Sequence, residues 1–204
     1  MLSIGVFLKY PEPGQVKTRL AADIGADRAA LVYEKMMRQV LGSLEELSSQ
    51  SFAPHLFYDP RHSVAAYQGL LPNHSWPLHA QAPGGLGDRL KQASFELAEL
   101  KAPFAFIGTD CVDLKAEHFE ETLALLVGGS DLVVGPANDG GYYLIALKQP
   151  HAALFDGIDW STDKVFAQTI AKAREAKLSV GLLEMLEDID DKGALDRHPE
   201  LLNY

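Results

Sequence analysis

Ser3-Ile-Gly-Val-Phe-Leu8 decides the fold class, because its apolar side chains fall on both faces of the strand that it predicts. Strands with two apolar faces are typical of the interior of a parallel sheet covered by helices. A loop rich in proline and glycine follows, Lys9–Leu20. Helical periodicity then runs from about Asp27, a plausible N-cap, to Leu47. A strand, a loop and an amphipathic helix in this order predict the first unit of an α/β fold.

The same alternation continues along the chain. Strands are expected at His55–Tyr58, Trp76–Ala80, Phe104–Ile107, Leu132–Val134, Tyr142–Leu147 and Ser179–Leu183. Helices are expected at Val64–Leu70, at Leu86–Leu100, at Lys115–Val127, from Ser161 as N-cap to about Ala176, and close to the last residue. This pattern predicts a Rossmann-like mixed, mainly parallel sheet with helices on both faces. The short connection after Val134 predicts one antiparallel or irregular pair. With no internal repeat or linker, we expect one domain over residues 1–204.

Composition excludes several classes of protein. The chain has 204 residues, 47% of them hydrophobic, which is the composition of a globular protein. A net charge of −10 argues against broad nucleic-acid binding, which needs a basic surface. No segment approaches the roughly 20 apolar residues of a membrane span, and the first residues lack the basic start of a signal peptide. The single cysteine fits a reducing compartment. We expect a cytoplasmic protein with no nucleic-acid or membrane partner, and a homo-oligomer stays open.

Three loops that follow predicted strands carry the polar residues suited to chemistry: Lys9–Leu20, Gly108–Leu114 and Gly135–Tyr143. In doubly wound sheets, ligands bind beyond the carboxyl ends of the strands. We therefore expect the three loops to line a single cleft at that edge.

The first loop fits the binding of a nucleotide diphosphate. Gly14 lets the backbone turn so that its N–H groups can surround phosphate oxygens, and Lys17 and Arg19 add positive charge from exposed positions. Lys9 and Thr18 of the same loop join this nucleotide-binding set. The glycine spacing matches neither a Walker A loop nor a dinucleotide fingerprint. The alternative is a solvated surface loop.

The second loop offers metal ligands. Asp110 follows a buried apolar strand, so its carboxylate is held rigidly, and Mg²⁺ prefers one or two carboxylates with phosphate oxygens and water. Asp113 is a second candidate, although it could instead cap the next helix. Cys111 has no histidine close to it in sequence, so an inert buried thiol is expected rather than a nucleophile.

Three further groups have both a functional and a structural interpretation. Asp139 could bind a sugar hydroxyl or act as a base, or Asn138–Gly141 could be a simple hairpin turn. Asp88 and Arg89 open a helix whose N-terminus could bind an anion, or Asp88 could only cap it. The acidic run Glu187–Asp191 could hold a metal or lie exposed. The seven histidines show no zinc-type spacing, and no nucleophile elbow is present.

Five segments, in this order, resemble a GT-A-like nucleotide-diphospho-sugar transferase family, formerly a domain of unknown function and associated with radical-SAM or selenium-related genes. They are Phe7-Leu-Lys-Tyr-Pro-Glu-Pro-Gly-Gln-Val-Lys-Thr-Arg-Leu20, Gly87-Asp-Arg-Leu90, Gly108-Thr-Asp-Cys-Val-Asp-Leu114, Gly135-Pro-Ala-Asn-Asp-Gly-Gly-Tyr-Tyr-Leu144 and Trp160-Ser-Thr162. The wider superfamily includes phospholactate and molybdenum-cofactor guanylyltransferases. The chain departs from the family at Val112, where proline is usual, and at Asp191–Gly193, which replaces a Thr-Pro-Glu turn.

The resemblance implies a metal-dependent transferase that uses a nucleotide-activated donor, a small-molecule acceptor and Mg²⁺ or Mn²⁺. It implies that Asp110 is the principal metal ligand and that Asp188 and Asp190 supply a second metal contact. Asp139 would face the acceptor, and Lys17 would hold nucleotide phosphates together with Arg19. Asp110, Asp139 and Lys17 are therefore the expected catalytic residues.

Three functions remain open at this stage. The family resemblance favours a glycosyltransferase acting on a nucleotide-diphospho-sugar. The Lys17-Thr-Arg19 loop would also suit a nucleotidyltransferase that transfers a nucleoside monophosphate from a triphosphate to a small phosphorylated acceptor. The third is a non-catalytic nucleotide-binding module.

Overall fold

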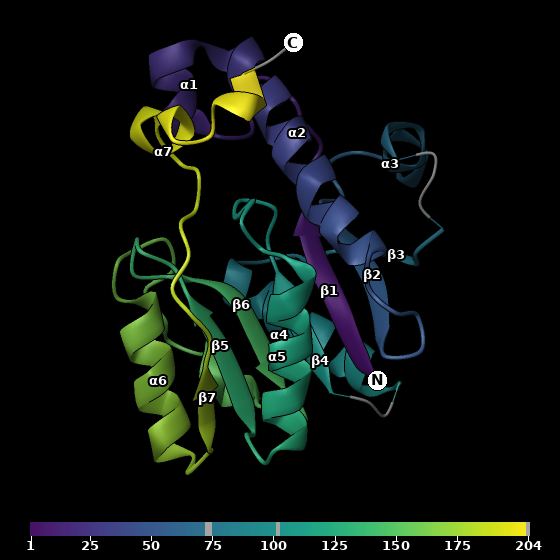
Figure 1. The fold of residues 1–204 in the computed structure, drawn as a ribbon, viewed down its shortest axis with the longest axis vertical. Helices are drawn as coiled ribbons and strands as arrows, with labels where there is room; N and C mark the ends of the chain where they lie inside the picture. The colour runs from purple at the N-terminus through teal and green to yellow at the C-terminus, as the bar shows by residue number, and fades with distance from the viewer. Residues whose placement is uncertain (72–74, 101–102, 203–204) are drawn as a thin grey trace.

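The computed structural model describes residues 1–71, 75–100 and 103–202. At its centre lies a seven-stranded sheet of order β3-β2-β1-β4-β6-β5-β7 (Figure 1). Its strands are β1 (Leu2–Leu8), β2 (Phe52–Tyr58), β3 (Leu78–Ala80), β4 (Phe104–Ile107), β5 (Leu132–Pro136), β6 (Tyr142–Leu147) and β7 (Val180–Leu182). Only β6 runs antiparallel to its neighbours, β4 and β5; every other pairing is parallel. The predicted mixed, mainly parallel sheet is confirmed, as is the antiparallel pair after Val134.

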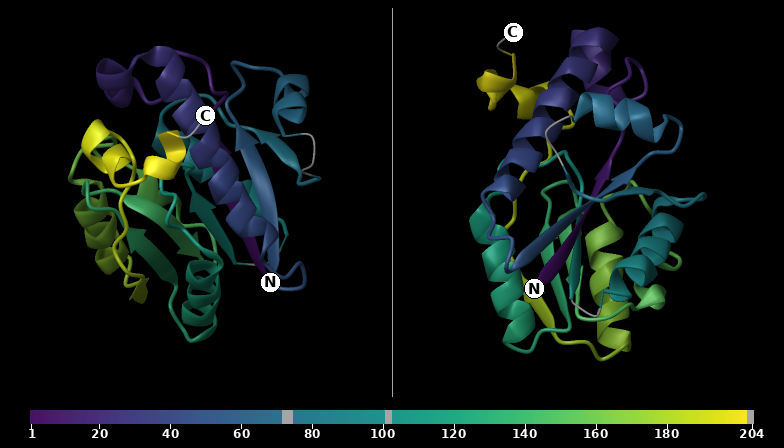
Figure 2. Two further views of the ribbon diagram at one scale, coloured as in Figure 1. Left: turned by 45° about the horizontal axis from the view of Figure 1, so that its top comes forward. Right: turned by 90° about the vertical axis from the view of Figure 1, so that its right-hand side faces the viewer.

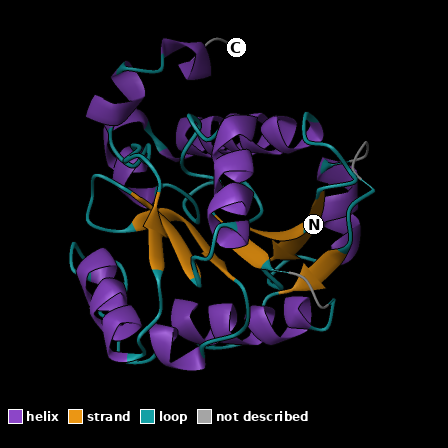
Figure 3. Cartoon of the chain, turned by 60° about the horizontal axis from the view of Figure 1, so that its bottom comes forward, coloured by secondary structure: helices purple, strands orange, loops and turns teal. Residues whose placement is uncertain are grey.

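Helices cover both faces of this sheet (Figure 3). One face packs against α2 (Ala26–Glu45), α3 (Val64–Leu70) and α5 (Ala116–Val127). The other packs against α4 (Leu86–Ala98), α6 (Val165–Glu175) and the 3₁₀ turn η1 (Ala152–Phe155). Connections that place helices on both faces are the expected consequence of parallel strands, since each parallel pair needs a crossover.

The central strand β1 shows how the two cores meet. Ile4 and Val6 are fully buried on the face covered by α2. Gly5, between them, faces the other way, where an added Cβ would lie 2.6 Å from the ring of Phe106 and 3.1 Å from that of Phe57. Glycine at this position therefore lets two phenyl rings pack directly against the backbone of β1.

The helix that follows the first loop differs from the prediction. A separate helix, α1 (Thr18–Ile24), occupies the end of the expected loop, and α2 begins only after it. Gly25 separates the two helices with φ of 88°, a conformation that breaks a right-handed helix. Asp27 consequently lies in the first turn of α2, and the prediction that it is the N-cap is wrong.

The start of α6 was also mispredicted. Ser161 is not its N-cap but has φ of 63°, and the helix begins at Val165. Thr162 instead organises the preceding turn, because its Oγ1 donates a hydrogen bond to the Asp159 carbonyl and accepts one from the Lys164 N–H. This polar turn moves the N-cap from Ser161 to Lys164, so the helix begins three residues later than expected.

The last helices lie against the first ones. Helix α7 (Lys192–Asp196) contacts α1, and the 3₁₀ turn η2 (Pro199–Leu202) contacts α2 (Figures 1 and 2). Ile189 and Leu195 are buried there against Leu20 and Met36. The segment after β7 is thereby held across the carboxyl ends of the strands. Within the described residues, no helix has both the length and the apolar character needed to cross a membrane.

Candidate active site at the carboxyl edge of the sheet

The loops that follow β1, β4, β5 and β7 leave the sheet at the same edge, because these four strands run in one direction. Two of the three predicted loops meet there directly. The Nζ of Lys17 lies 2.6 Å from Oδ1 of Asp110. The loop after β5 joins through Asn138, whose Nδ2 donates to Glu187 of the last segment at 3.0 Å. The structure thus brings residues from all three loops and the acidic run to one edge.

Lys17 is the most enclosed charge at this edge. Its side chain is only 4% exposed, and its ammonium also lies 2.9 Å from Oδ1 of Asp190. Burial alone would lower the pKa of Lys17, but Asp110 and Asp190 outweigh that effect and raise it. The expectation of an exposed Lys17 is therefore wrong: the lysine is a buried cation shared by two carboxylates.

The rest of the phosphate-binding set lies at the surface. Arg19 is 71% exposed and also donates to Asp190. Thr18 is exposed at the start of α1, and Lys9 is exposed just after β1. Gly14 has φ of 78° with open space where a Cβ would be, so its backbone conformation rather than crowding favours glycine. These residues remain accessible to a ligand that approaches the edge.

Tyr33 of α2 joins the first two loops. Its buried hydroxyl oxygen accepts a hydrogen bond from the Lys9 N–H at 2.8 Å and another from Thr109 Oγ1 at 3.1 Å. Burial, assisted by the nearby Asp110 carboxylate, raises the pKa of Tyr33 to about 12, so the phenol stays protonated. Asp110 follows Thr109 and is 45% exposed, so its carboxylate is fixed at one side and open at the other.

Asp188 contributes an unusual carboxylate from the segment after β7. The segment is fixed next to it, where the Ile189 N–H donates to the Asp110 carbonyl at 2.9 Å. Burial raises the pKa of Asp188 to about 7; Asp110, Asp139 and Asp190 raise it further, while Lys17 opposes them. Within the part of the chain that the structure describes, the Asp188 carboxylate has no hydrogen-bond partner. A cation placed here would relieve both the burial cost and the repulsion.

The donor set fits a divalent cation that is shared with a substrate. Asp110 and Asp188 supply two hard carboxylates, whereas Asp190 is taken up by Lys17 and Arg19. Across residues 1–71, 75–100 and 103–202, no group of three or more histidine, cysteine, aspartate or glutamate side chains is arranged to hold a metal. Two carboxylates with phosphate and water oxygens is the arrangement that Mg²⁺ prefers. The residues present therefore suit an ion that arrives with a phosphate.

Asp139 makes the predicted turn and keeps an exposed carboxylate at this edge. Its Oδ1 accepts from the Gly141 N–H at 2.8 Å, which makes the turn, yet the side chain is exposed and close enough to affect Asp188. Gly140 has φ of 88°, and a Cβ there would lie 2.3 Å from the Asp163 carbonyl oxygen. The turn is therefore tightly packed and its carboxylate well defined.

Asp88 and Arg89 are not in contact with the Lys17–Asp110 pair. Asp88 accepts from the Gly85 N–H at 3.2 Å and pairs with Lys91, as a capping residue does. Arg89 donates to Gln81 Oε1 at 3.1 Å. The structure supports the capping alternative for Asp88 and ties Arg89 into the loop after β3.

The remaining residues of the second loop have structural surroundings. Cys111 is buried, and burial together with Asp188 raises the pKa of its thiol to about 12, which agrees with an inert thiol. Asp113 does not cap α5, whose N-cap is Lys115; its Oδ2 lies 3.8 Å from His198 Nε2.

Sequence reasoning missed the contacts that hold the first loop. Gln15 accepts from Arg61, which also pairs with the buried Asp59 after β2. Gln81 donates to the carbonyls of Leu8 and Phe57. The rule that polar residues directly after strands line the ligand edge would have indicated Asp59 and Gln81, because each follows a strand.

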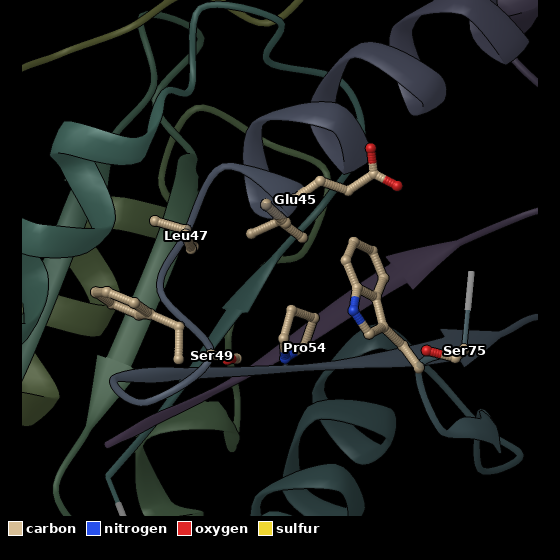
Figure 4. Close-up of a pocket in the computed structure, with 8 residues that line it drawn as sticks. Glu45, Leu47, Ser49, Pro54 and Ser75 are labelled. Carbon is tan, nitrogen blue, oxygen red and sulfur yellow. The ribbon is translucent and has the colours of Figure 1, made fainter. Parts of the chain in front are cut away.

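A separate hollow of about 370 Å³ lies away from this edge, near the amino end of β2 (Figure 4). It is lined by Leu44, Glu45, Leu47, Ser49, Phe52, Pro54, Ser75 and Trp76. None of the residues predicted to carry chemistry belongs to it.

Comparison with known proteins places this geometry in context. Residues 43–162 match the family described as "Uncharacterized protein conserved in bacteria (DUF2064)". Among curated proteins, nothing matched. The chain is also similar to a crystal structure from Desulfovibrio desulfuricans G20, whose protein is provisionally named a nucleotide-diphospho-sugar transferase. The two sequences are 32% identical, the TM-score is 0.88, and the match covers 98% of this chain and 87% of that one.

Two more distant structures share the fold. One is 4-diphosphocytidyl-2C-methyl-D-erythritol synthase from Anaerococcus prevotii, with 10% identity, a TM-score of 0.62 and coverage of 99% and 98%. The other is glucosyl-3-phosphoglycerate synthase from Mycobacterium tuberculosis, in complex with Mn²⁺, UDP and glucosyl-3-phosphoglycerate, with 10% identity, a TM-score of 0.59 and coverage of 98% and 75%.

Proposed function

The chain belongs to the DUF2064 family, and from its site we propose a metal-dependent transferase that moves a sugar from a nucleotide-diphospho-sugar to a small acceptor. The chain is a nucleotide-using transferase, like the proteins that share its fold. One observation carries the finer proposal: Lys17, Asp110 and the unpartnered Asp188 meet at the carboxyl edge of the sheet. This is the edge where α/β sheets bind ligands.

Each residue has a role that its surroundings allow. Asp110 and Asp188 would hold Mg²⁺ or Mn²⁺, and the bound ion would supply positive charge to the phosphate oxygens of the leaving group. Arg19 contacts Asp190 through Nη2, so its other guanidinium N–H groups can donate to a phosphate while that pair persists. Asp139, on the other side, would orient an acceptor hydroxyl.

Charge favours glycosyl over nucleotidyl transfer. The cations Lys17 and Arg19 come from the loop after β1, whereas the side of the loop after β5 carries Asp139 and Asp188, and Glu187 there is paired with Arg197. A phosphorylated acceptor would be repelled by these carboxylates, but a neutral hydroxyl would be accepted. Nucleotidyl transfer remains the second candidate, because Lys17 and Arg19 lie together on Asp190 and could serve a triphosphate.

The by-product separates the two reactions. The protein is incubated with Mn²⁺, a set of small hydroxyl-bearing and phosphorylated acceptors, and either nucleotide-sugars or nucleoside triphosphates, and released nucleoside diphosphate or pyrophosphate is measured. We expect nucleoside diphosphate from a nucleotide-sugar. Binding without turnover is followed by thermal melting, since a ligand at 100 times its Kd stabilises by about 2.7 kcal/mol.

The matched variants are Asp110→Asn and Asp113→Asn. Both remove one carboxylate from the same loop, but Asp113 is 48% exposed and points to His198 rather than Lys17. Only the Asp110 variant should lose turnover. Release of pyrophosphate would transfer the assignment to the second candidate. Absence of any nucleotide effect on melting, with and without Mn²⁺, would contradict both.

A further inference from the structure

Lys17 occupies a position for which a divalent cation would compete. We propose that its ammonium is the resident cation of the ligand-free site, and that a divalent ion gains Asp110 only when a phosphate-bearing donor draws Lys17 away. The inference rests on the proposed function, because the ion and the donor are those assigned there. It adds an order of events that the proposed function does not require.

The contact distances make the two cations rivals. Lys17 Nζ lies 2.6 Å from Asp110 Oδ1, and a Mg²⁺ ion on a carboxylate oxygen lies about 2.0–2.1 Å from it. Both cations on this carboxylate would stand within a few ångströms of one another in a partly enclosed site, where like charges repel strongly. The ion therefore binds well only after the ammonium has moved.

The surroundings make this movement feasible. Asp190 keeps Arg19 as a partner when Lys17 leaves, so it does not become an unpaired charge. Lys17 has φ of 45° and ψ of 48°, a left-handed conformation that non-glycine residues adopt at a cost, so its position depends on the contacts its side chain makes. Asp188, with no hydrogen-bond partner among the described residues, is the carboxylate that the arriving ion gains.

Charge explains why ion and donor should arrive together. A divalent ion alone adds two positive charges beside an ammonium that is already in place. An ion with a diphosphate brings its own negative charge, and the phosphate oxygens offer Lys17 a new partner. Binding of the two ligands is then positively coupled, and the coupling is reciprocal. The ligand-free enzyme should consequently bind Mn²⁺ weakly.

The test measures Mn²⁺ binding without nucleotide or turnover, by the electron paramagnetic resonance signal of free Mn²⁺. Lys17→Met keeps the length of the side chain and removes its charge, and should bind Mn²⁺ at least about tenfold more tightly than the wild type. Lys192→Met is the matched control: it removes the same charge from a side chain that is 55% exposed and paired with Asp196. Its affinity should equal that of the wild type.

Two further variants support the interpretation of this measurement. If Lys17→Met does not fold, Lys17→Asn replaces it in the same binding experiment, because asparagine tolerates the left-handed conformation. Adding Asp110→Asn to Lys17→Met should abolish the gain, which assigns the ion to Asp110. Added UDP should tighten Mn²⁺ binding to the wild type more than to Lys17→Met.

Two outcomes would overturn the inference: an Mn²⁺ affinity of both Lys17 variants that does not exceed that of the wild type, or the same gain in affinity in Lys192→Met. A protein that gains Mn²⁺ affinity on loss of Lys17 but binds no nucleotide would show that Lys17 and the ion compete for Asp110. That result would refute release of Lys17 by a donor, and with it the proposed function.

Discussion

Replacing Asp188 with asparagine should stabilise the metal-free protein at alkaline pH far more than at acidic pH. Burial, followed by Asp110, raises the pKa of Asp188 from 3.8 to about 7. Between these values the folded chain keeps a proton that the unfolded chain has lost, so the free energy of unfolding of the wild type falls as pH rises through this window. At about 1.4 kcal/mol for each tenfold difference, the ionised carboxylate costs on the order of 4 kcal/mol at pH 8. Asparagine does not titrate and avoids this cost.

Urea unfolding at pH 4.5 and pH 8 measures the effect. The variant-minus-wild-type difference in unfolding free energy should increase by about 3 kcal/mol between the two pH values. Asp23→Asn, which removes an exposed carboxylate on α1, should show no such increase. Saturating Mn²⁺ together with UDP should stabilise the wild type at pH 8 more than the Asp188 variant. A difference that is the same at both pH values would refute the view that Asp188 is a buried carboxylate under charge repulsion.

Three other substitutions test the site. Asp110→Asn should lower Mn²⁺-dependent turnover by about 100-fold or more while the protein still melts cooperatively. Turnover is measured against Mn²⁺ concentration, and a normal rate would mean that Asp110 has only a structural role. Tyr33→Phe removes the acceptor of the Lys9 N–H and should lower the free energy of unfolding, measured with urea, by about 1–3 kcal/mol. An unchanged free energy of unfolding would mean that water replaces the hydroxyl. Gly140→Ala should destabilise more than Gly14→Ala, because both have positive φ but only Gly140 meets backbone; equal melting temperatures would contradict this.

Elements with a strong local pattern were predictable from the sequence. The bounds of β4, β6 and α3 agree with the expectation, because an apolar run or helical spacing framed by polar residues is a local property. The separate α1 and the late start of α6 were not predictable, because they depend on positive φ at Gly25 and on the polar turn around Thr162. Glycine permits a positive φ without imposing it, and a short polar turn leaves no periodic pattern in the sequence.

The residues of the candidate site were predictable from the sequence, but the ion pairs between them were not. The strand-end rule and the family resemblance singled out Lys17, Asp110, Asp188 and Asp190. They assigned the lysine to a phosphate and the aspartates to a metal, whereas the fold joins Lys17 to Asp110 and Asp190. Tyr33 lies within the stretch predicted only as an amphipathic helix, because helical spacing does not show which group a tyrosine hydroxyl will contact.

The closure of the site by the segment after β7 sets when the site can form during synthesis. A ribosome releases the chain from its first residue onward, and all seven strands have been translated once Leu182 is added. Lys17 can meet Asp110 at that stage, but Asp190 lies 173 positions after Lys17 and emerges later. Until then neither the Asp188 carboxylate nor the Ile189 N–H bond to Asp110 exists. A chain truncated just beyond β7 would possess every described strand but lack Asp188 and Asp190, so the residues after Leu182 complete the site rather than the sheet.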